Sequence, residues 1–200
     1  MSSIGILGAG NIGSAFARAM ARHDIPAVIA NRRGPESLEP LVRELGPSIR
    51  AGTREEVAAQ DIVLVAVNWS KLPAALAGLP DWNGRIVIDA NNPIEAPLFQ
   101  PADLGGRASS EVFTDLVPGA RVVKAFNHLQ PHLLSGDPQA EGGQRVLFYS
   151  GDDTRAKSEV GGLIERLGFF GIDLGALAVG GRLVQFPGGP LPALNLAKFD

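Results

Sequence analysis

The stretch Ile-Gly-Ile-Leu-Gly-Ala-Gly-Asn-Ile-Gly, residues 4–13, decides the fold. Its first four residues predict a short buried strand, and a Gly-x-Gly-x-x-Gly turn follows directly. Apolar residues then recur at helical spacing to about residue 22. A strand, a glycine turn and a helix in this order form the first unit of a dinucleotide-binding α/β domain.

Each glycine of the turn has a physical role in such a unit. Gly8 permits the tight turn, Gly10 leaves room for a pyrophosphate, and Gly13 lets the helix pack closely against the strand. The backbone N–H groups and the positive end of the helix dipole then face the phosphates. The alternative is a glycine-rich connection without a ligand, which the strand–helix context disfavours. The cofactor-binding residues expected here are Gly8, Ala9, Gly10, Asn11, Ile12 and Gly13.

Strand and helix patterns alternate along the rest of the chain. Apolar runs predict strands at 26–30, 49–51, 61–67, 85–89, 121–126, 145–149 and 169–174. Helical patterns cover 37–45, 69–79, 109–116 and 153–167, and a further helix starts at Thr53 with a capping-box pattern. We expect a long connection at 127–143 and a loop with a short helix near Leu194 within 175–200. This order predicts an α/β fold, a Rossmann-type doubly wound, mostly parallel sheet in one domain (1–200), with a smaller C-terminal portion at 145–200.

Composition narrows the class of protein. The 200 residues include no cysteine, which excludes disulfides, thiolate nucleophiles and cysteine-ligated zinc. The formal net charge of -3 gives no general attraction to nucleic acid or to an anionic membrane. The chain has no apolar run long enough for a transmembrane helix, and its first residues lack the basic region of a signal peptide. We therefore expect a cytoplasmic protein without a nucleic-acid or membrane partner.

The end of the second expected strand favours NADP over NAD. In NAD-binding proteins this position usually carries an acidic residue that binds the ribose hydroxyls. Here the sequence continues with Asn31, Arg32 and Arg33 instead. A planar guanidinium is well matched to a 2′-phosphate, whereas a carboxylate would repel it. The alternative, a solvated pair of surface arginines, is less favoured at this position.

Three further strand ends could line a nicotinamide. Ligands of open α/β sheets lie outside the carboxyl ends of the strands, and asparagine side chains can both donate to and accept from a carboxamide. The alternative is that each asparagine only closes its own loop. The candidate residues are Val67, Asn68 and Trp69, then Asn91 and Asn92, then Ala125, Phe126 and Asn127.

The histidines offer little catalytic chemistry. His128 and His132 have the spacing of one helical face, but no nearby carboxylate or cysteine completes a metal site, so we expect no bound metal. His128 alone could act as a proton donor, or could be a polar residue at the start of a loop. The sequence predicts no catalytic residue, and no serine hydrolase motif is present.

The chain resembles the NADPH-dependent reductases of the deazaflavin coenzyme F420, a group that includes dinucleotide-binding enzymes of bacteria and the reductase domain of six-transmembrane metalloreductases. The resemblance spans essentially the whole chain. It is carried by the glycine turn, Asn31 to Arg33, and the segments 122–127, 150–153 and 181–184. The form of 122–127 is closer to the bacterial and metalloreductase branch than to the archaeal deazaflavin enzymes.

The resemblance implies direct hydride transfer between NADP(H) and a flavin-like acceptor, either coenzyme F420 or a flavin. It implies that residues 145–200 lie on the acceptor side, with the tail 183–191 as a wall. Some relatives carry a basic residue after the arginine pair, where this chain has Pro35 and Glu36, so Ser37 is expected to substitute as a cofactor ligand. A homodimer is also suggested, because relatives form dimers and the apolar tail needs a cover.

Three functions remain open at this point. The first is an NADP-dependent oxidoreductase with a small-molecule redox acceptor such as F420. The second is an NADP-binding sensor or regulatory module without turnover, since a Rossmann fold alone does not define a reaction. The third is an NADPH-dependent reductase of a small carbonyl or imine, which would need His128 as the proton donor.

Overall fold

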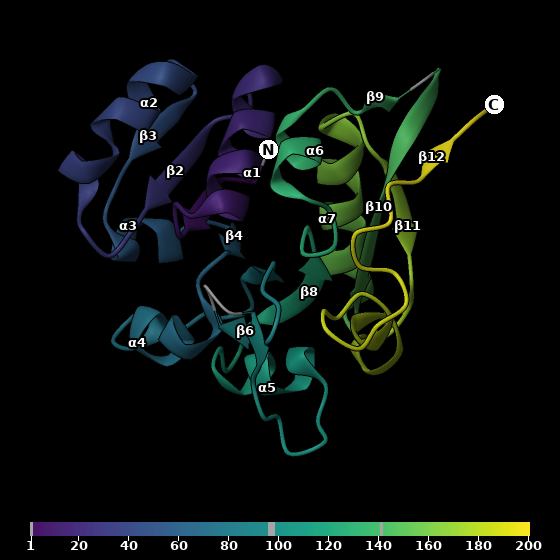
Figure 1. Ribbon diagram of the computed structural model, residues 1–200. Coiled ribbons are helices and arrows are strands. Elements are labelled where there is room, and N and C mark those ends of the chain that lie inside the picture. The colour runs from purple at the N-terminus through teal and green to yellow at the C-terminus, as the bar shows by residue number, and fades with distance from the viewer. Residues whose placement is uncertain (1, 96–98, 141) are drawn as a thin grey trace.

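A computed structural model of the chain describes residues 2–95, 99–140 and 142–200. Its main sheet has the strand order β11-β10-β8-β5-β4-β1-β2-β3 (Figure 1). These strands are β1 (Ile4–Leu7), β2 (Ala27–Ala30), β3 (Ile49–Ala51), β4 (Ile62–Val65), β5 (Ile86–Asp89), β8 (Arg121–Ala125), β10 (Gly143–Gly151) and β11 (Phe170–Asp173). The short strands β9 (Gln139–Ala140) and β12 (Ala197–Lys198) pair with β10, and β6 (Ile94–Glu95) pairs with β7 (Gln100–Pro101).

Helices connect the strands. The α-helices are α1 (Asn11–Arg22), α2 (Glu39–Leu45), α3 (Arg54–Ala58), α4 (Leu72–Leu76), α5 (Ser109–Asp115), α6 (Pro131–Ser135) and α7 (Thr154–Arg166). Shorter helical turns are η1 (Pro35–Leu38), η2 (Trp69–Lys71) and η3 (Leu177–Gly181). No helix among these described segments has the length and apolar character needed to cross a membrane.

The sheet confirms the predicted doubly wound architecture. From β3 through β2, β1, β4 and β5 to β8, neighbouring strands run parallel. The direction in which the chain adds strands reverses at β1, which lies between β2 and β4. In such sheets the ligand crevice forms outside the carboxyl ends of the strands at this reversal. The glycine turn directly follows β1, so it lies at this point of the sheet.

Each face of the sheet carries its own apolar core. Ile62 and Leu64 of β4 pack into the core beneath α1 and α7, whereas Val63 and Val65 pack into the core beneath α3, α4 and α5. This alternation follows from the two-residue repeat of a strand. It explains why 61–67 is apolar at nearly every position, because a central strand covered on both sides needs apolar residues on both faces.

Strand β10 departs from the parallel pattern. It is longer than the strand expected at 145–149, and it runs antiparallel to β8. Its pairing with β8 stops where Tyr149 lies opposite Ala125, yet the strand begins at Gly143. The first part of β10 therefore projects beyond the carboxyl end of β8, and β12 pairs with that part.

Two expected elements were wrong in detail. The segment 127–143 is more than a connection, because it contains α6, which packs beside α1 (Figure 1). The tail has no helix near Leu194. Ala193 adopts a positive φ of 63°, which an α-helix cannot contain, and its N–H donates to the carbonyl of His128. The helical turn of the tail is η3 instead.

Candidate cofactor site

The glycine turn has the geometry that a pyrophosphate site requires. Gly8 has a φ of +110°, and a Cβ there would lie 2.2 Å from the carbonyl oxygen of Ala66. A Cβ on Gly13 would lie 1.9 Å from the carbonyl oxygen of Gly8, so the helix can approach the strand only without a side chain. Gly10 differs, because a Cβ there would meet nothing within 4 Å. The space above Gly10 is open to a ligand.

The start of α1 has free hydrogen-bond donors facing that space. Gly10 is the N-cap residue and supplies no side-chain acceptor. The first N–H groups of an α-helix have no acceptor within the helix. Ser14 directs its hydroxyl to the carbonyl oxygen of Ala9 at 3.2 Å, which fixes the turn from behind. Backbone donors and the helix dipole therefore favour an anion at this point.

The loop after β2 presents an arginine pair beside the glycine turn. The N–H of Gly8 donates to the carbonyl oxygen of Ala30 at 2.8 Å, which ties the two turns together. The Asn31 side chain folds the loop, because its Oδ1 accepts from the N–H of Arg33 at 2.8 Å and its Nδ2 donates to Ser37 Oγ at 2.9 Å. Within the described chain, the side chains of Arg32 and Arg33 are exposed and make no ion pair. They remain available for a phosphate.

The structure brings the strand ends at Val67 and Asn91 together, but turns their polar groups inward. Asn91 is buried, and its Oδ1 accepts from the N–H of Val67 at 2.8 Å. Its Nδ2 donates to Asp89 Oδ1 at 2.8 Å. Asn68 is exposed and Trp69 is half-buried at the start of η2. At Asn91 the crevice is therefore lined by backbone and by neighbouring surface, because the side-chain amide is already bonded within the protein.

The strand ends after β5 and β8 hold the C-terminal tail. Asn92 Nδ2 donates to the carbonyl oxygen of Asn127 at 2.8 Å, and Asn127 Nδ2 donates to the carbonyl oxygen of Val184 at 2.7 Å. The N–H of Phe186 donates to Asn92 Oδ1 at 3.1 Å. The two asparagines therefore close their own loops and also fasten the tail across the crevice edge.

Two of the candidate residues after β8 face the core. Ala125 and Phe126 are fully buried, and the Phe126 ring packs edge-on against Phe16 of α1 with ring centroids 4.9 Å apart. Phe126 has a positive φ of 64°, which turns the chain sharply after the strand. Its side chain supports the helix that carries the glycine turn, and only its backbone lies at the strand end.

His128 is buried between the strand end and the wall formed by β10. Its ring lies 5.0 Å from the ring of Phe148, centroid to centroid. Burial lowers the pKa of His128 to about 4, and the backbone of Val146 opposes this shift only in part. The imidazole is therefore neutral at pH 7. Within the described residues no group of three or more His, Asp or Glu side chains could hold a metal.

A polar hollow of about 340 Å³ lies beside the glycine turn, between α1 and α6. The residues that line this hollow include Gly10 just before α1, Asn11 and Arg18 of α1, and His132 and Ser135 of α6. The contribution of α6 was not predicted from the sequence, because the polar, Pro- and Gly-containing segment 127–143 is typical of a connection. The signal was Pro131, which favours the first position of a helix. A second hollow, of about 390 Å³, lies at the amino ends of β1 to β3 and so at the opposite edge.

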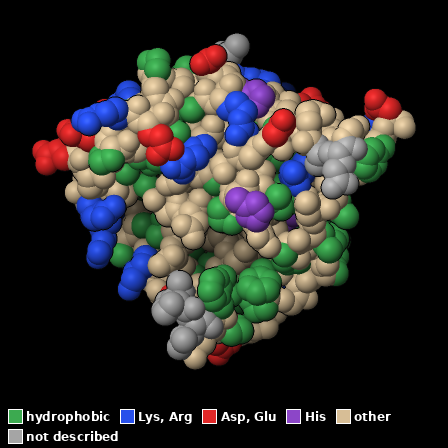
Figure 2. Space-filling view, turned by 45° about the horizontal axis from the view of Figure 1, so that its top comes forward, with side chains coloured by type: hydrophobic (Ala, Val, Ile, Leu, Met, Phe, Trp, Pro, Cys, Tyr) green, Lys and Arg blue, Asp and Glu red, His purple; other side chains and the backbone are tan. Residues whose placement is uncertain are grey.

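On the face drawn in Figure 2, basic and hydrophobic side chains lie on different sides of a hollow. Figure 2 shows lysine and arginine side chains gathered on the left of a hollowed face and hydrophobic side chains gathered at its lower edge. Phe186, one of the exposed hydrophobic residues, is 42% exposed. A crevice of this kind suits a ligand that is charged at one end and a planar, apolar group at the other.

Comparison with known proteins agrees with this geometry. Residues 3–93, from β1 to the strand end at Asn92, match the family described as NADP oxidoreductase, coenzyme F420-dependent. Over residues 3–93 the chain is therefore similar to this family. The match includes the glycine turn, the arginine loop and the first two nicotinamide-side strand ends.

Three relatives extend the likeness to the whole chain. The hypothetical protein SMa0349 of Sinorhizobium meliloti has 46% identity and a TM-score of 0.94, with 99% of this chain and 96% of that one covered. A candidate F420-dependent NADP reductase of Arthrobacter sp. FB24 has 28% identity and a TM-score of 0.74, with 88% and 86% covered. Metalloreductase STEAP3 of Rattus norvegicus is 30% identical over 196 residues. That alignment covers 95% of this chain, which spans only 37% of the metalloreductase.

Proposed function

We propose that this chain is a cytoplasmic NADP-dependent oxidoreductase that transfers hydride between NADP(H) and a flavin-like acceptor, with coenzyme F420 as the first candidate. One observation carries the proposal: open space above Gly10 lies beside Arg32 and Arg33, which are exposed and make no ion pair with any described residue, at the carboxyl edge of the sheet. A pyrophosphate fits the first position and a 2′-phosphate fits the second. When bound, NADPH supplies the hydride, and the protein supplies its binding and orientation.

Different residues of the chain bind different parts of the cofactor. The first N–H groups of α1 hold negative charge at the turn, and Gly13 allows the helix to stand close enough to do so. Arg32 and Arg33 bind the phosphate that distinguishes NADP from NAD. Asn31 and Ser37 keep the arginine loop folded, because their side chains bond to each other and to the loop backbone. Ser37 is thus a loop-forming residue, and it also remains a candidate ligand.

The tail supports a planar acceptor. Asn92 and Asn127 fasten the backbone at Val184 and Phe186 to the strand ends, where a nicotinamide lies in related folds. The partly exposed ring of Phe186 is then close to the place where an acceptor would bind, and aromatic rings stack favourably on planar groups. A flavin-like ring fits this surface.

The site needs no acid–base catalyst for such a transfer. Hydride transfer between two aligned rings depends mainly on proximity and orientation. Reduction of a small carbonyl or imine would instead require a proton donor. His128 suits that role poorly, because it is buried and its pKa is lowered to about 4. The geometry therefore favours a ring acceptor over a carbonyl or imine.

A panel of acceptors tests the proposal. Purified protein is mixed with NADPH and either F420, FMN or a ferric chelate, and the cofactor absorbance is followed. We expect rapid oxidation of NADPH with F420, and much slower oxidation when NADH replaces NADPH. Oxidation of NADPH with FMN or the ferric chelate, but not with F420, would identify that compound as the acceptor in place of F420. Tight NADPH binding without oxidation by any of the three would instead support a sensor.

We also propose that the chain forms a homodimer and has no nucleic-acid or membrane partner. Exposed side chains of the tail, including Leu196 at 42% and Phe199 at 59%, give apolar surface that a second copy could cover. Light scattering on a size-exclusion column measures the mass directly. A monomer mass across the concentration range would refute the dimer.

A further inference from the structure

A buried ion pair lies where two central strands end. Lys124 of β8 and Asp89 of β5 are register partners on neighbouring parallel strands, and Lys124 Nζ lies 2.9 Å from Asp89 Oδ2. Both side chains are fully buried. Burial lowers the pKa of Lys124, and the neighbouring carboxylate of Asp89 opposes that shift. Two charges in the interior are costly to desolvate, so the pair is a poor device for stability alone.

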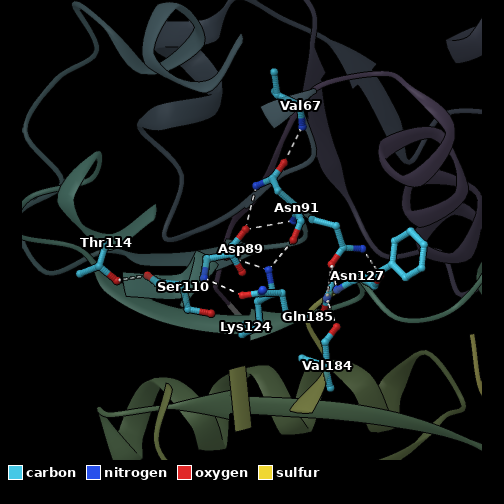
Figure 3. A network of polar contacts seen from close by, with 12 residues as sticks. Val67, Asp89, Asn91, Ser110, Thr114, Lys124, Asn127, Val184 and Gln185 are labelled. Carbon is cyan, nitrogen blue, oxygen red and sulfur yellow. Dashed lines mark hydrogen bonds and ion pairs between the residues drawn. The ribbon is translucent and has the colours of Figure 1, made fainter. Parts of the chain in front are cut away.

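The pair is the base of a chain of hydrogen bonds that reaches the crevice (Figure 3). Asp89 Oδ1 accepts from the N–H of Asn91 at 3.0 Å and from its Nδ2 at 2.8 Å. Lys124 Nζ also donates to the carbonyl oxygen of Asn91. Asn91 Oδ1 then accepts from the N–H of Val67, which follows β4. The ammonium group of Lys124 therefore helps to fix the backbone at Asn91, which follows β5, and through the Asn91 side chain the backbone at Val67, which follows β4.

We infer that Lys124, acting through Asp89 and Asn91, is a positioning residue that holds the backbone at Val67 and Asn91 against the nicotinamide half of the cofactor. The inference rests on the proposed function, which places NADP in this crevice. Lys124 and Asp89 cannot touch a ligand themselves, because neither has any exposed surface. Their effect must therefore pass through Asn91. Asp89 and Lys124 lie on strands that β4 and β1 separate from β2 and its arginine loop, whereas Val67 lies close to Gly8 of the glycine turn. The network should therefore act more strongly on the nicotinamide half of the cofactor than on its phosphates.

Two ligands separate this role from a general structural one. NADPH carries the nicotinamide, whereas 2′-phospho-ADP-ribose keeps the pyrophosphate and the 2′-phosphate but lacks that ring. The test variant is Lys124→Met combined with Asp89→Asn, which removes both charges and leaves neither buried alone. The control is Lys157→Met, which breaks a partly exposed ion pair between Lys157 of α7 and Asp173 of β11. Dissociation constants are measured for both ligands, together with the fluorescence of the bound dihydronicotinamide.

We expect the double variant to bind NADPH about 5- to 150-fold more weakly, the usual range for coupling between linked groups. Its affinity for 2′-phospho-ADP-ribose should stay within about twofold of the wild type, because the arginine loop and the first N–H groups of α1 take no part in the network. The fluorescence of bound NADPH should move toward that of free NADPH. Lys157→Met should change neither affinity. If the double variant does not fold, Asp89→Asn alone is used, since it keeps the shape of the side chain and allows Lys124 to lose its charge.

Other outcomes overturn the inference. Equal losses for both ligands would show that the pair only stabilises the sheet. Unchanged affinity and fluorescence with NADPH would show that the network does not reach the nicotinamide. Failure of the wild-type protein to bind either ligand would refute the proposed function instead, and this result is distinct from the other two.

Discussion

Replacing Arg32 by alanine should reduce the preference of the protein for NADPH over NADH without weakening its fold. The guanidinium of Arg32 is exposed and makes no ion pair within the described residues, so its removal leaves no buried group without a partner. Surface substitutions of this kind usually change stability by less than about 0.5 kcal/mol. The thermal midpoint of the variant should therefore match that of the wild type.

The loss of NADPH binding can be worked out from the bond that is removed. A hydrogen bond to a charged group contributes about 1.5–3 kcal/mol. Because about 1.4 kcal/mol corresponds to a factor of ten, the dissociation constant for NADPH should rise by roughly 10- to 150-fold. NADH lacks the 2′-phosphate, so its dissociation constant should stay within about twofold of the wild-type value. The ratio of the two constants is thus the quantity to measure.

Titration of the bound dihydronicotinamide fluorescence gives both constants under the same conditions. Arg155→Ala is a matched control, because Arg155 is also exposed but lies in the first turn of α7, away from the arginine loop. Raising the salt concentration should reduce the difference between NADPH and NADH in the wild type, since exposed charges are screened. Equal losses for the two cofactors in Arg32→Ala, or no loss for NADPH, would refute 2′-phosphate recognition by this residue.

Three further predictions follow from the site. Gly10→Ala should leave the thermal midpoint nearly unchanged but weaken NADPH binding at least about tenfold, because the new Cβ would enter open space that a pyrophosphate would fill. Gly13→Ala should instead destabilise the fold, because its Cβ would lie 1.9 Å from the carbonyl oxygen of Gly8. Because the pKa of His128 is lowered to about 4, the unfolded chain binds a proton between about pH 6.5 and pH 4 that the folded chain does not bind. Unfolding titrations should therefore show up to about 3 kcal/mol of stability that is present above pH 6.5 and is lost toward pH 4. The His128→Phe variant should not show this loss. Phe186→Ala should lower kcat/KM for a planar acceptor several-fold and leave the dissociation constant of NADPH unchanged, and equal effects on both would contradict a role in stacking.

Local sequence patterns were sufficient to predict the cofactor half of the fold. The glycine turn shows a strong local constraint, because the backbone there leaves no space for a side chain at Gly8 or Gly13. The apolar run at 61–67 shows another, because a central strand packs against a core on each face of the sheet. Residues 3–93 match the family described as NADP oxidoreductase, coenzyme F420-dependent, and the sheet confirms the doubly wound topology. The role of each cofactor-binding residue remains a prediction that the variants above can test.

The features that were missed depend on contacts between distant residues. Nothing near Lys124 in the sequence reveals its pairing with Asp89, because that contact arises only when β8 lies beside β5. The antiparallel direction of β10 also depends on long-range pairing. That Asn91, Asn92 and Asn127 line a ligand stays a prediction, but their amide partners could not be read from the sequence. The Asn91 amide bonds to Asp89 and to the N–H of Val67, whereas Asn92 and Asn127 bond to each other's loops and to the tail.

The tail reaches the crevice from outside the parallel sheet, and this has a consequence for protein engineering. Two side-chain amides hold it at the backbone of Val184 and Phe186, and two of its own side chains also hold it, because Val184 is buried and Gln185 Oε1 accepts from the N–H of Ser109. Exposed residues of this segment, such as Phe186, can therefore be exchanged without shifting the register of any parallel strand. Libraries that aim at new electron acceptors should therefore be concentrated there, while the dinucleotide scaffold is left untouched.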